Sequence, residues 1–186
     1  KISDAGEVAL GIIAPDGRDG MIQHAEQFAA AGVPFLFDPG QGLPMFGKVE
    51  LDRFLELATY AAVNDYEAKM LCDKTGDTLE GIALRLKGGL IVTRGAEGSW
   101  VFTGGQRYDI PCVKADELVD PTGCGDAYRG GLLYGLSEGM PLVQAAKLAS
   151  LMGSIKIAHK GGQNYQLGRD EIAARFEQAF GEKPWA

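Results

Sequence analysis

Short apolar segments alternate with helix-forming segments through roughly the first half of the chain, and this alternation restricts the fold more than any other feature. Apolar runs predict strands, and apolar residues spaced three and four apart predict helices. Strands are predicted at residues 7–13, 33–37, 60–63 and 90–93, and helices at residues 19–31, 51–58 and 78–86. This order favours parallel strands with helices packed on the faces of the sheet. The prediction is an α/β domain with a mainly parallel central sheet, which binds ligands beyond the carboxyl ends of its strands.

A β-hairpin is predicted after the last of these strands. Residues 99–102 and 107–110 have strand patterns, and Gly104-Gly105 between them suits a two-residue turn. The sheet is therefore expected to end in an antiparallel pair.

Two helices are predicted toward the C-terminal end of the chain. Pro141 suits the first turn of a helix whose apolar face is wide enough to be buried. Small residues on that face, which allow close packing against the preceding helix, are Ala145, Ala149 and Gly153. The last helix extends to about residue 180, with Asp170 as its predicted cap and packing as its only predicted role.

Composition and charge favour a small-molecule partner. The 186 residues, 46% of them hydrophobic, suit a single domain with a sizeable core. A net charge of −7 argues against nucleic acid and anionic membranes, which need a basic surface. No apolar run or leader pattern suggests a membrane span or a signal peptide, so a cytoplasmic location is expected. The three cysteines have no metal-ligand spacing, and reduced thiols are expected.

A glycine-rich segment before a helical pattern suggests a site for an anion. Gly123, Gly125 and Asp126 precede apolar residues that predict a helix to about residue 137. The first N–H groups of a helix have no intrahelical partner, and glycines let a ligand approach them closely. Asp126 has two interpretations: a general base beside the bound anion, or an acid that only stabilises the helix N-terminus.

Two other loops follow predicted strands, and local structure alone can account for the residues of each. Asn64 and Glu67 are three residues apart after the third strand, which is typical of a helix-capping pair. Thr93, Gly95 and Gly98 follow the fourth strand, where two glycines three apart can simply begin a hairpin.

The segment Asp120-Pro121-Thr122-Gly123-Cys124-Gly125-Asp126, followed by Ala127 and Tyr128, closely resembles the C-terminal signature of the ribokinase/PfkB family of carbohydrate and nucleoside kinases. The resemblance implies a three-layer ribokinase-like sandwich with helices on both faces of the sheet. It implies that Asp126 is the catalytic base and that Gly123, Cys124 and Gly125 form the anion hole for the transferred phosphate. Pro121 and Cys124 depart from the usual Thr and Ala, but both departures keep the amides of residues 123–126.

The resemblance also implies roles for the other loops. Asn64 and Glu67 would act on Mg²⁺ through ordered water. Thr93, Gly95 and Gly98 would lie near the phosphates and ribose of ATP. The loop 161–163, with Gly161 and Gly162, would border the nucleotide and a monovalent cation, K⁺. Position alone, one helical turn after Asp126, suggests that Arg129 contacts a phosphate or a substrate oxygen, with an ordinary surface arginine as the alternative.

The implied activity is transfer of the γ-phosphate of ATP to an alcohol group of a nucleoside or sugar. The Asp-Pro-Thr-Gly form looks most like bacterial adenosine kinases, so adenosine is the foremost acceptor and a fructokinase- or ribokinase-like activity is the near alternative. A second class is a non-catalytic nucleotide-binding fragment, because the chain looks like the C-terminal part of such a kinase without its N-terminal lid region. The expected partners are therefore the small-molecule substrate and either that missing part or another copy of the chain, and the chain alone is expected to react slowly.

Overall fold

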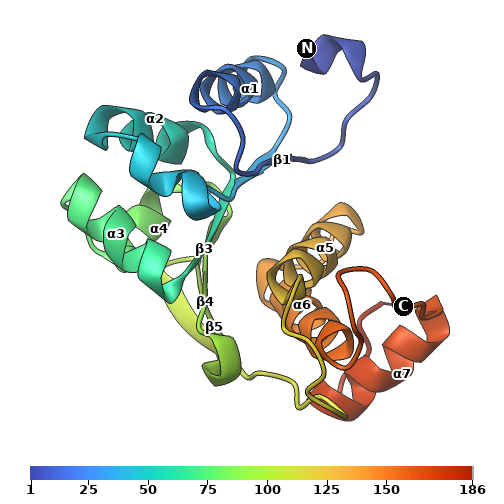
Figure 1. Cartoon of the computed structure of the whole chain (residues 1–186). Coiled ribbons are helices and arrows are strands. Elements are labelled where there is room, and N and C mark those ends of the chain that lie inside the picture. The colour runs from blue at the N-terminus through green and yellow to red at the C-terminus, as the bar shows by residue number, and fades with distance from the viewer. Residues whose placement is uncertain (186) are drawn as a thin grey trace. The chain divides into compact units, whose positions relative to one another are not determined.

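The computed structural model describes residues 1–185, which form two compact units (Figure 1). Unit A comprises Lys1–Arg94 and Trp100–Arg107, and unit B comprises Gly95–Ser99 and the chain from Tyr108 onward. The positions of the two units relative to one another are not determined, so each is described by itself. The expectation of a single domain stays a prediction.

Unit A contains the alternating strands and helices that the sequence predicts. In Figure 1, helices α1 to α4 all lie on one face of the sheet. The elements are η1 (Ile2–Asp4), β1 (Gly11–Ile13), α1 (Arg18–Ala30), β2 (Phe35–Phe37), η2 (Gly40–Met45), α2 (Lys48–Leu57), β3 (Tyr60–Asn64), α3 (Asp65–Thr75), α4 (Leu79–Arg85) and β4 (Gly89–Thr93). The sequence analysis did not anticipate the short helices η1 and η2, and for α3 it predicted only a capping pair at Asn64 and Glu67 without bounds for the helix.

The strands form one six-stranded sheet in the order β1-β2-β3-β4-β5-β6. The pairs β1–β2, β2–β3 and β3–β4 are parallel. The predicted hairpin is present as β5 (Ser99–Thr103) and β6 (Gln106–Ile110), and both turn glycines have the positive φ values that a two-residue turn requires. The prediction of a mainly parallel α/β sheet is confirmed.

Strand β1 is shorter than the predicted residues 7–13. It pairs only with β2, and the register matches Gly11 to Phe35 and Ile13 to Phe37. The residue before β2 is Pro34, whose carbonyl accepts the Gly11 N–H but which has no N–H of its own to extend the ladder. Pairing therefore starts at residue 11.

Aromatic packing holds the helices of unit A against the sheet. Phe37 of β2 stacks on Phe54 of α2 with ring centroids 4.4 Å apart, and Phe46 meets Phe54 edge-on at 5.0 Å. All three rings are buried, and aromatic pairs in these geometries stabilise beyond their buried area.

Unit B is built on a close pair of antiparallel helices, α5 (Cys124–Ser137) and α6 (Leu142–Ile157). A Cβ atom on Gly131 would be 3.0 Å from Cα of Ala149, and one on Gly135 would be 3.0 Å from Cα of Ala145. The two backbones therefore approach as closely as glycine permits, which confirms that small residues on α6 serve close packing.

Helix α7 (Arg169–Phe180) differs from the prediction at its first residue. The cap is Gly168, in an extended conformation, and Asp170 lies within the first turn beside Glu171. The prediction that Asp170 is the cap is wrong, because the helix begins at Arg169, two residues before the start that an Asp170 cap implies. The carboxylates still interact favourably with the helix dipole. Among the described residues, no helix has the length and apolar character that crossing a membrane requires.

The α5–α6 contact predicts opposite effects for two glycine substitutions. G135A places a methyl group against the backbone of Ala145, and overpacking of this kind costs about 1–3 kcal/mol. G130A places the same group where no atom lies within 4 Å, and replacing an exposed helical glycine by alanine stabilises by about 0.5–1 kcal/mol. Urea unfolding should give a lower free energy of unfolding for G135A and a higher one for G130A. Equal values for the two variants would contradict this packing.

Candidate active site

The sheet register places the first residues of two predicted motifs next to each other in unit A. Asn64 at the end of β3 pairs with Thr93 at the end of β4. The Thr93 hydroxyl donates a hydrogen bond of 3.4 Å to the carbonyl of Val63. Parallel strands end at the same edge, so the Asn64–Glu67 and Thr93–Gly98 segments both begin there.

Asn64 and Glu67 form a reciprocal capping box at the start of α3. The Glu67 N–H donates to Oδ1 of Asn64, and the Asn64 N–H donates to Oε2 of Glu67, both at 2.8 Å. The capping interpretation of this pair is therefore correct. The two oxygens of the half-buried Glu67 carboxylate can accept about four hydrogen bonds in all, and the capping box uses only one of these sites. The geometry is therefore compatible with an additional contact to metal-bound water.

The two glycines after β4 have different surroundings. A Cβ atom on Gly98 would lie 2.1 Å from the carbonyl oxygen of Ile110, whereas one on Gly95 would meet nothing within 4 Å. Gly98 is thus required by backbone packing, because the chain at residues 110–112 crosses it. Gly95 is exposed, and its surroundings allow a ligand to approach.

Helix α5 begins where the glycine-rich motif predicts. Gly123 precedes the first residue with φ = 77°, a conformation that favours glycine. The Cys124 N–H donates to the carbonyl of Pro121 at 3.2 Å, but within residues 1–185 the N–H groups of Gly125 and Asp126 have no protein acceptor. Gly125 and the Asp126 side chain are exposed, so the first turn presents donors and a carboxylate together.

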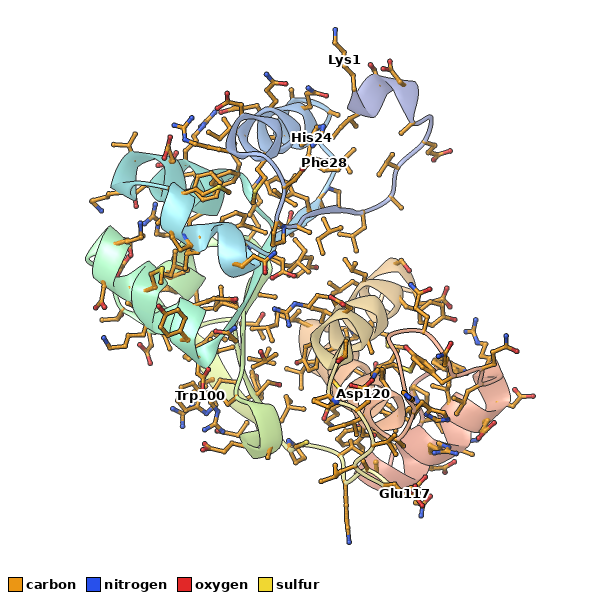
Figure 2. All side chains as sticks on the ribbon, in the orientation of Figure 1. Lys1, His24, Phe28, Trp100, Glu117 and Asp120 are labelled. Carbon is orange, nitrogen blue, oxygen red and sulfur yellow. The ribbon has the colours of Figure 1, made fainter. Side chains whose placement is uncertain are left out.

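Asp120 joins this turn to the loop after α6 (Figure 2). One carboxylate oxygen accepts the Thr122 N–H at 2.9 Å, and the other accepts the Gly161 N–H at 2.8 Å. The hydrogen bonds from Gly161 and Thr122 lower the pKa of Asp120 to about 2. A Cβ atom on Gly123 would be 3.2 Å from Cα of Gly162. Gly161 and Gly162 are thus brought beside the glycine-rich motif.

Tyr128 ties the end of the Gly95–Gly98 segment to α5. Its hydroxyl lies 2.9 Å from the hydroxyl of Ser99, and both side chains are buried. Burial raises the pKa of Tyr128 to about 12, so the phenol stays protonated and can donate. The half-buried Arg129 has its guanidinium 5.9 Å from the Tyr128 ring, and this position leaves both interpretations of Arg129 open.

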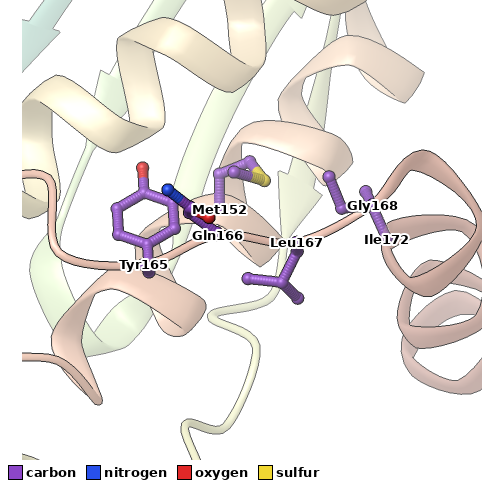
Figure 3. Close-up of a pocket in the computed structure, with 6 residues that line it drawn as sticks. All are labelled: Met152, Tyr165, Gln166, Leu167, Gly168 and Ile172. Atoms are coloured by element: carbon purple, nitrogen blue, oxygen red, sulfur yellow. The ribbon is translucent and has the colours of Figure 1, made fainter.

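A pocket of about 460 Å³ lies between α6, α7 and the segment that precedes α7 (Figure 3). Its lining residues are Met152, Tyr165, Gln166, Leu167, Gly168 and Ile172. The sequence analysis assigned only packing to α7, and this helix also contributes Ile172 to the pocket. The segment directly follows the loop 161–163 that the resemblance links to the nucleotide.

Sequence reasoning missed the supporting residues of this site, which are Ser99, Asp120, Tyr128 and Lys156. Lys156 carried a signal, because it lies four residues after Met152 and seven after Ala149, on the apolar face of α6. Among residues 1–185, no three His, Cys, Asp or Glu side chains gather around a possible metal position, and the three cysteines are free thiols.

Residues 5–167 match the model of the pfkB family carbohydrate kinases, and this span includes residues of both units. The chain belongs to the pfkB family. The ribokinase-like α/β fold that the motif implied is thereby confirmed. The Asn64–Glu67 and Thr93–Gly98 segments and the N-terminus of α5 all lie within the matched residues.

Nucleoside kinases are prominent among the similar proteins. The chain is 33% identical over 142 residues to a nucleoside kinase of Methanocaldococcus jannaschii, covering 76% of this chain and 47% of that protein. It is 55% identical to Burkholderia thailandensis nucleoside kinase, solved in complex with inosine, with a TM-score of 0.94 over 98% of this chain and 60% of that one. The same kinase was solved in complex with ADP-inosine, with a TM-score of 0.93. The chain spans about half the length of the curated relatives it matches.

The low pKa of Asp120 predicts a stability loss at acidic pH. Its folded pKa of about 2 lies below the ordinary value of 3.8, so its stabilising effect is complete above pH 3.8 and is lost as the pH falls toward 2. The melting temperature of D120N should therefore lie below that of the wild type at pH 6, and the difference should shrink as the pH falls. The exposed Asp16 in unit A offers the control D16N. A wild-type advantage that does not change with pH would contradict this role.

Proposed function

We propose that this chain carries the phosphate site and the general base of an ATP-dependent nucleoside kinase. The supporting observation is the first turn of α5, where the N–H groups of Gly125 and Asp126 have no acceptor within residues 1–185 and lie beside the exposed Asp126 carboxylate. A helix N-terminus of this kind attracts a phosphate. Solved complexes of the 55% identical relative with inosine and ADP-inosine support nucleoside and nucleotide as ligands.

The proposed mechanism assigns electrostatic and proton-transfer roles to this turn. Phosphoryl transfer depends on positioning and charge stabilisation, which the N–H groups of Gly123, Gly125 and Asp126 supply to the γ-phosphate. Cys124, the remaining member of the predicted anion hole, can join them only by giving up its hydrogen bond to Pro121. Asp126 accepts the proton of the acceptor hydroxyl, and a positioned base of this type contributes about 10² to 10⁴ in rate.

Mg²⁺ is the proposed metal, and when bound it neutralises phosphate charge during transfer. Asn64 and Glu67 are the residues that would hold its water ligands, because the capping box uses only part of their acceptor capacity. K⁺ at residues 161–163 is not part of this proposal, because the carbonyl oxygens of Asp120 and His159 beside that loop accept hydrogen bonds from the Lys156 ammonium.

The proposed contacts of the nucleotide are those that the family resemblance implies. Thr93, Gly95 and Gly98 would face its phosphates and ribose, Gly161 and Gly162 would border it, and Arg129 would contact a phosphate or substrate oxygen. The pocket between α6 and α7, with the aromatic ring of Tyr165 and apolar neighbours, suits a flat base. A cytoplasmic location, where ATP is supplied, belongs to the same proposal.

The acceptor is proposed to be a purine nucleoside. Adenosine is the acceptor that the motif suggests, and inosine is the nucleoside in the relative's solved complex. A sugar acceptor is the alternative, supported by 30% identity to a ribokinase of Lactococcus lactis over 131 residues. Turnover of adenosine, inosine and ribose, compared side by side, separates these acceptors.

Because the chain spans about half of its curated relatives, full activity is proposed to need a further segment or a second copy of the chain. Positioning of reactants supplies about 7–11 kcal/mol of a barrier, so the chain alone should bind ATP and react slowly. The test measures ADP formation by the chain with ATP, Mg²⁺ and nucleoside, with and without the remaining part of a nucleoside kinase as a separate polypeptide. ATP binding without turnover in every combination would favour the non-catalytic alternative.

D126N should abolish turnover in this assay, since the amide keeps the shape of the side chain and cannot accept the proton. ATP affinity should stay within a few-fold of the wild type, measured by calorimetric titration. The matched control is D170N, which changes an aspartate in the first turn of α7 and should leave turnover unchanged. Undiminished turnover by D126N would exclude its role as the base.

E67Q should raise the Mg²⁺ concentration that half-maximal turnover requires, because an amide binds metal-bound water less strongly than a carboxylate. The amide oxygen can still accept the Asn64 N–H, so the melting temperature should fall only slightly. If the magnesium titration of E67Q matched that of the wild type, the pair would have only its capping role.

A further inference from the structure

Lys156 is the one charged residue that the structure buries completely among the described residues. It lies in the last turn of α6 with 0% of its surface exposed. Its ammonium donates hydrogen bonds to the carbonyl oxygen of Asp120 at 2.7 Å and to that of His159 at 3.1 Å. A buried ammonium is unfavourable unless oxygen atoms replace its hydration, so these carbonyls account for its presence there.

The two acceptors belong to different loops of the candidate site. Asp120 precedes the glycine-rich turn at Gly123, and His159 precedes the glycines at 161 and 162. The end of α6 is also bonded to the first of these loops, because the Ile157 carbonyl accepts the N–H groups of Val119 and Asp120. The negative end of the α6 dipole adds further stabilisation for a positive charge at this position.

Backbone carbonyls that converge on one positive charge from two loops are the ligand set that proteins also use for a dehydrated K⁺ ion. In this chain the Lys156 ammonium takes the place of the ion and donates to the carbonyls of Asp120 and His159. The adjacent Gly161 directs its N–H toward the Asp120 carboxylate, and this donor cannot bind a cation. The residues around the 161–163 loop therefore do not fit the monovalent cation that the family resemblance implied.

We infer that the Lys156 ammonium is a built-in cation that joins the glycine-rich turn to the 159–162 loop and makes a bound monovalent cation unnecessary there. Lys156 is thus a positioning residue for the phosphate site. It holds the carbonyl of Asp120, whose carboxylate holds Thr122 on one side and Gly161 on the other. Removal of the charge should separate the two loops.

The first test compares the melting temperature of the wild-type protein in KCl, NaCl and tetramethylammonium chloride at equal ionic strength. The inference expects the same value in all three salts. A melting temperature that rises in KCl relative to both other salts, and does so equally in K156M, would overturn it, because K⁺ would then stabilise the protein whether or not the ammonium is present. This comparison needs no kinase activity.

The second test uses variants at this position. K156A should lower the melting temperature, and KCl or ammonium chloride, but not tetramethylammonium chloride, should restore part of the loss, because a small cation can enter the space. K156M fills that space without a charge, so it should lower the melting temperature in every salt. The exposed Lys160 provides the control K160A, which should behave as the wild type.

Wild-type stability of K156M, or a K156A variant that no cation restores, would each overturn the inference, since the ammonium would then act only through packing. If K156A does not fold, the melting temperature of K156M and the wild-type salt series still test the inference. The activity measurement rests on the proposed function: ammonium chloride should restore turnover to K156A more than tetramethylammonium chloride does. Because the melting temperatures are independent of turnover, failure of the nucleoside kinase proposal would leave them informative.

Discussion

The close contact between α5 and α6 is the constraint on which the rest of unit B depends. Glycines on α5 meet the backbone of α6 at Ala145 and Ala149, so the separation of the two helices is set by main-chain atoms and not by flexible side chains. A short connection makes the pair antiparallel, which places the N-terminus of α5 beside the C-terminus of α6. A Cβ atom on Gly153 would accordingly lie 3.8 Å from the carbonyl of Cys124.

Two helix ends of opposite polarity therefore meet at the candidate phosphate site. The N-terminus of α5 has unused N–H groups and favours an anion, whereas the C-terminus of α6 has carbonyl groups and favours a cation. Lys156 provides that cation from within the chain, and Asp120 links the two loops through hydrogen bonds at 2.8 and 2.9 Å. The candidate phosphate-binding turn is thus held by an ammonium and a carboxylate that both already have hydrogen-bond partners within the chain.

In unit A, one pair of residues combines local stability with a proposed function. The capping box of Asn64 and Glu67 starts α3, and the β3–β4 register puts Asn64 opposite Thr93. The capping hydrogen bonds restrict both side chains to one conformation each. Such restriction also suits a residue that orients metal-bound water, because a group held in place loses less entropy on binding. Structural and functional interpretations of this pair are therefore compatible.

The sequence by itself determined the elements and the position of the glycine-rich turn. Alternating patterns predicted the strands of unit A and its helices α1, α2 and α4, and Gly123 with its neighbours predicted the start of α5, because helix and turn signals are local. Only the tertiary structure decided where β1 begins, why Gly98 must be glycine, and that Lys156 is buried between two carbonyls. Each of these depends on a segment that is distant in the sequence. Strand β1 depends on β2 after Pro34, Gly98 on the chain at residues 110–112, and Lys156 on the loops at Asp120 and His159. Local sequence cannot specify such pairings, because their energies arise from contacts that exist only after the chain has folded.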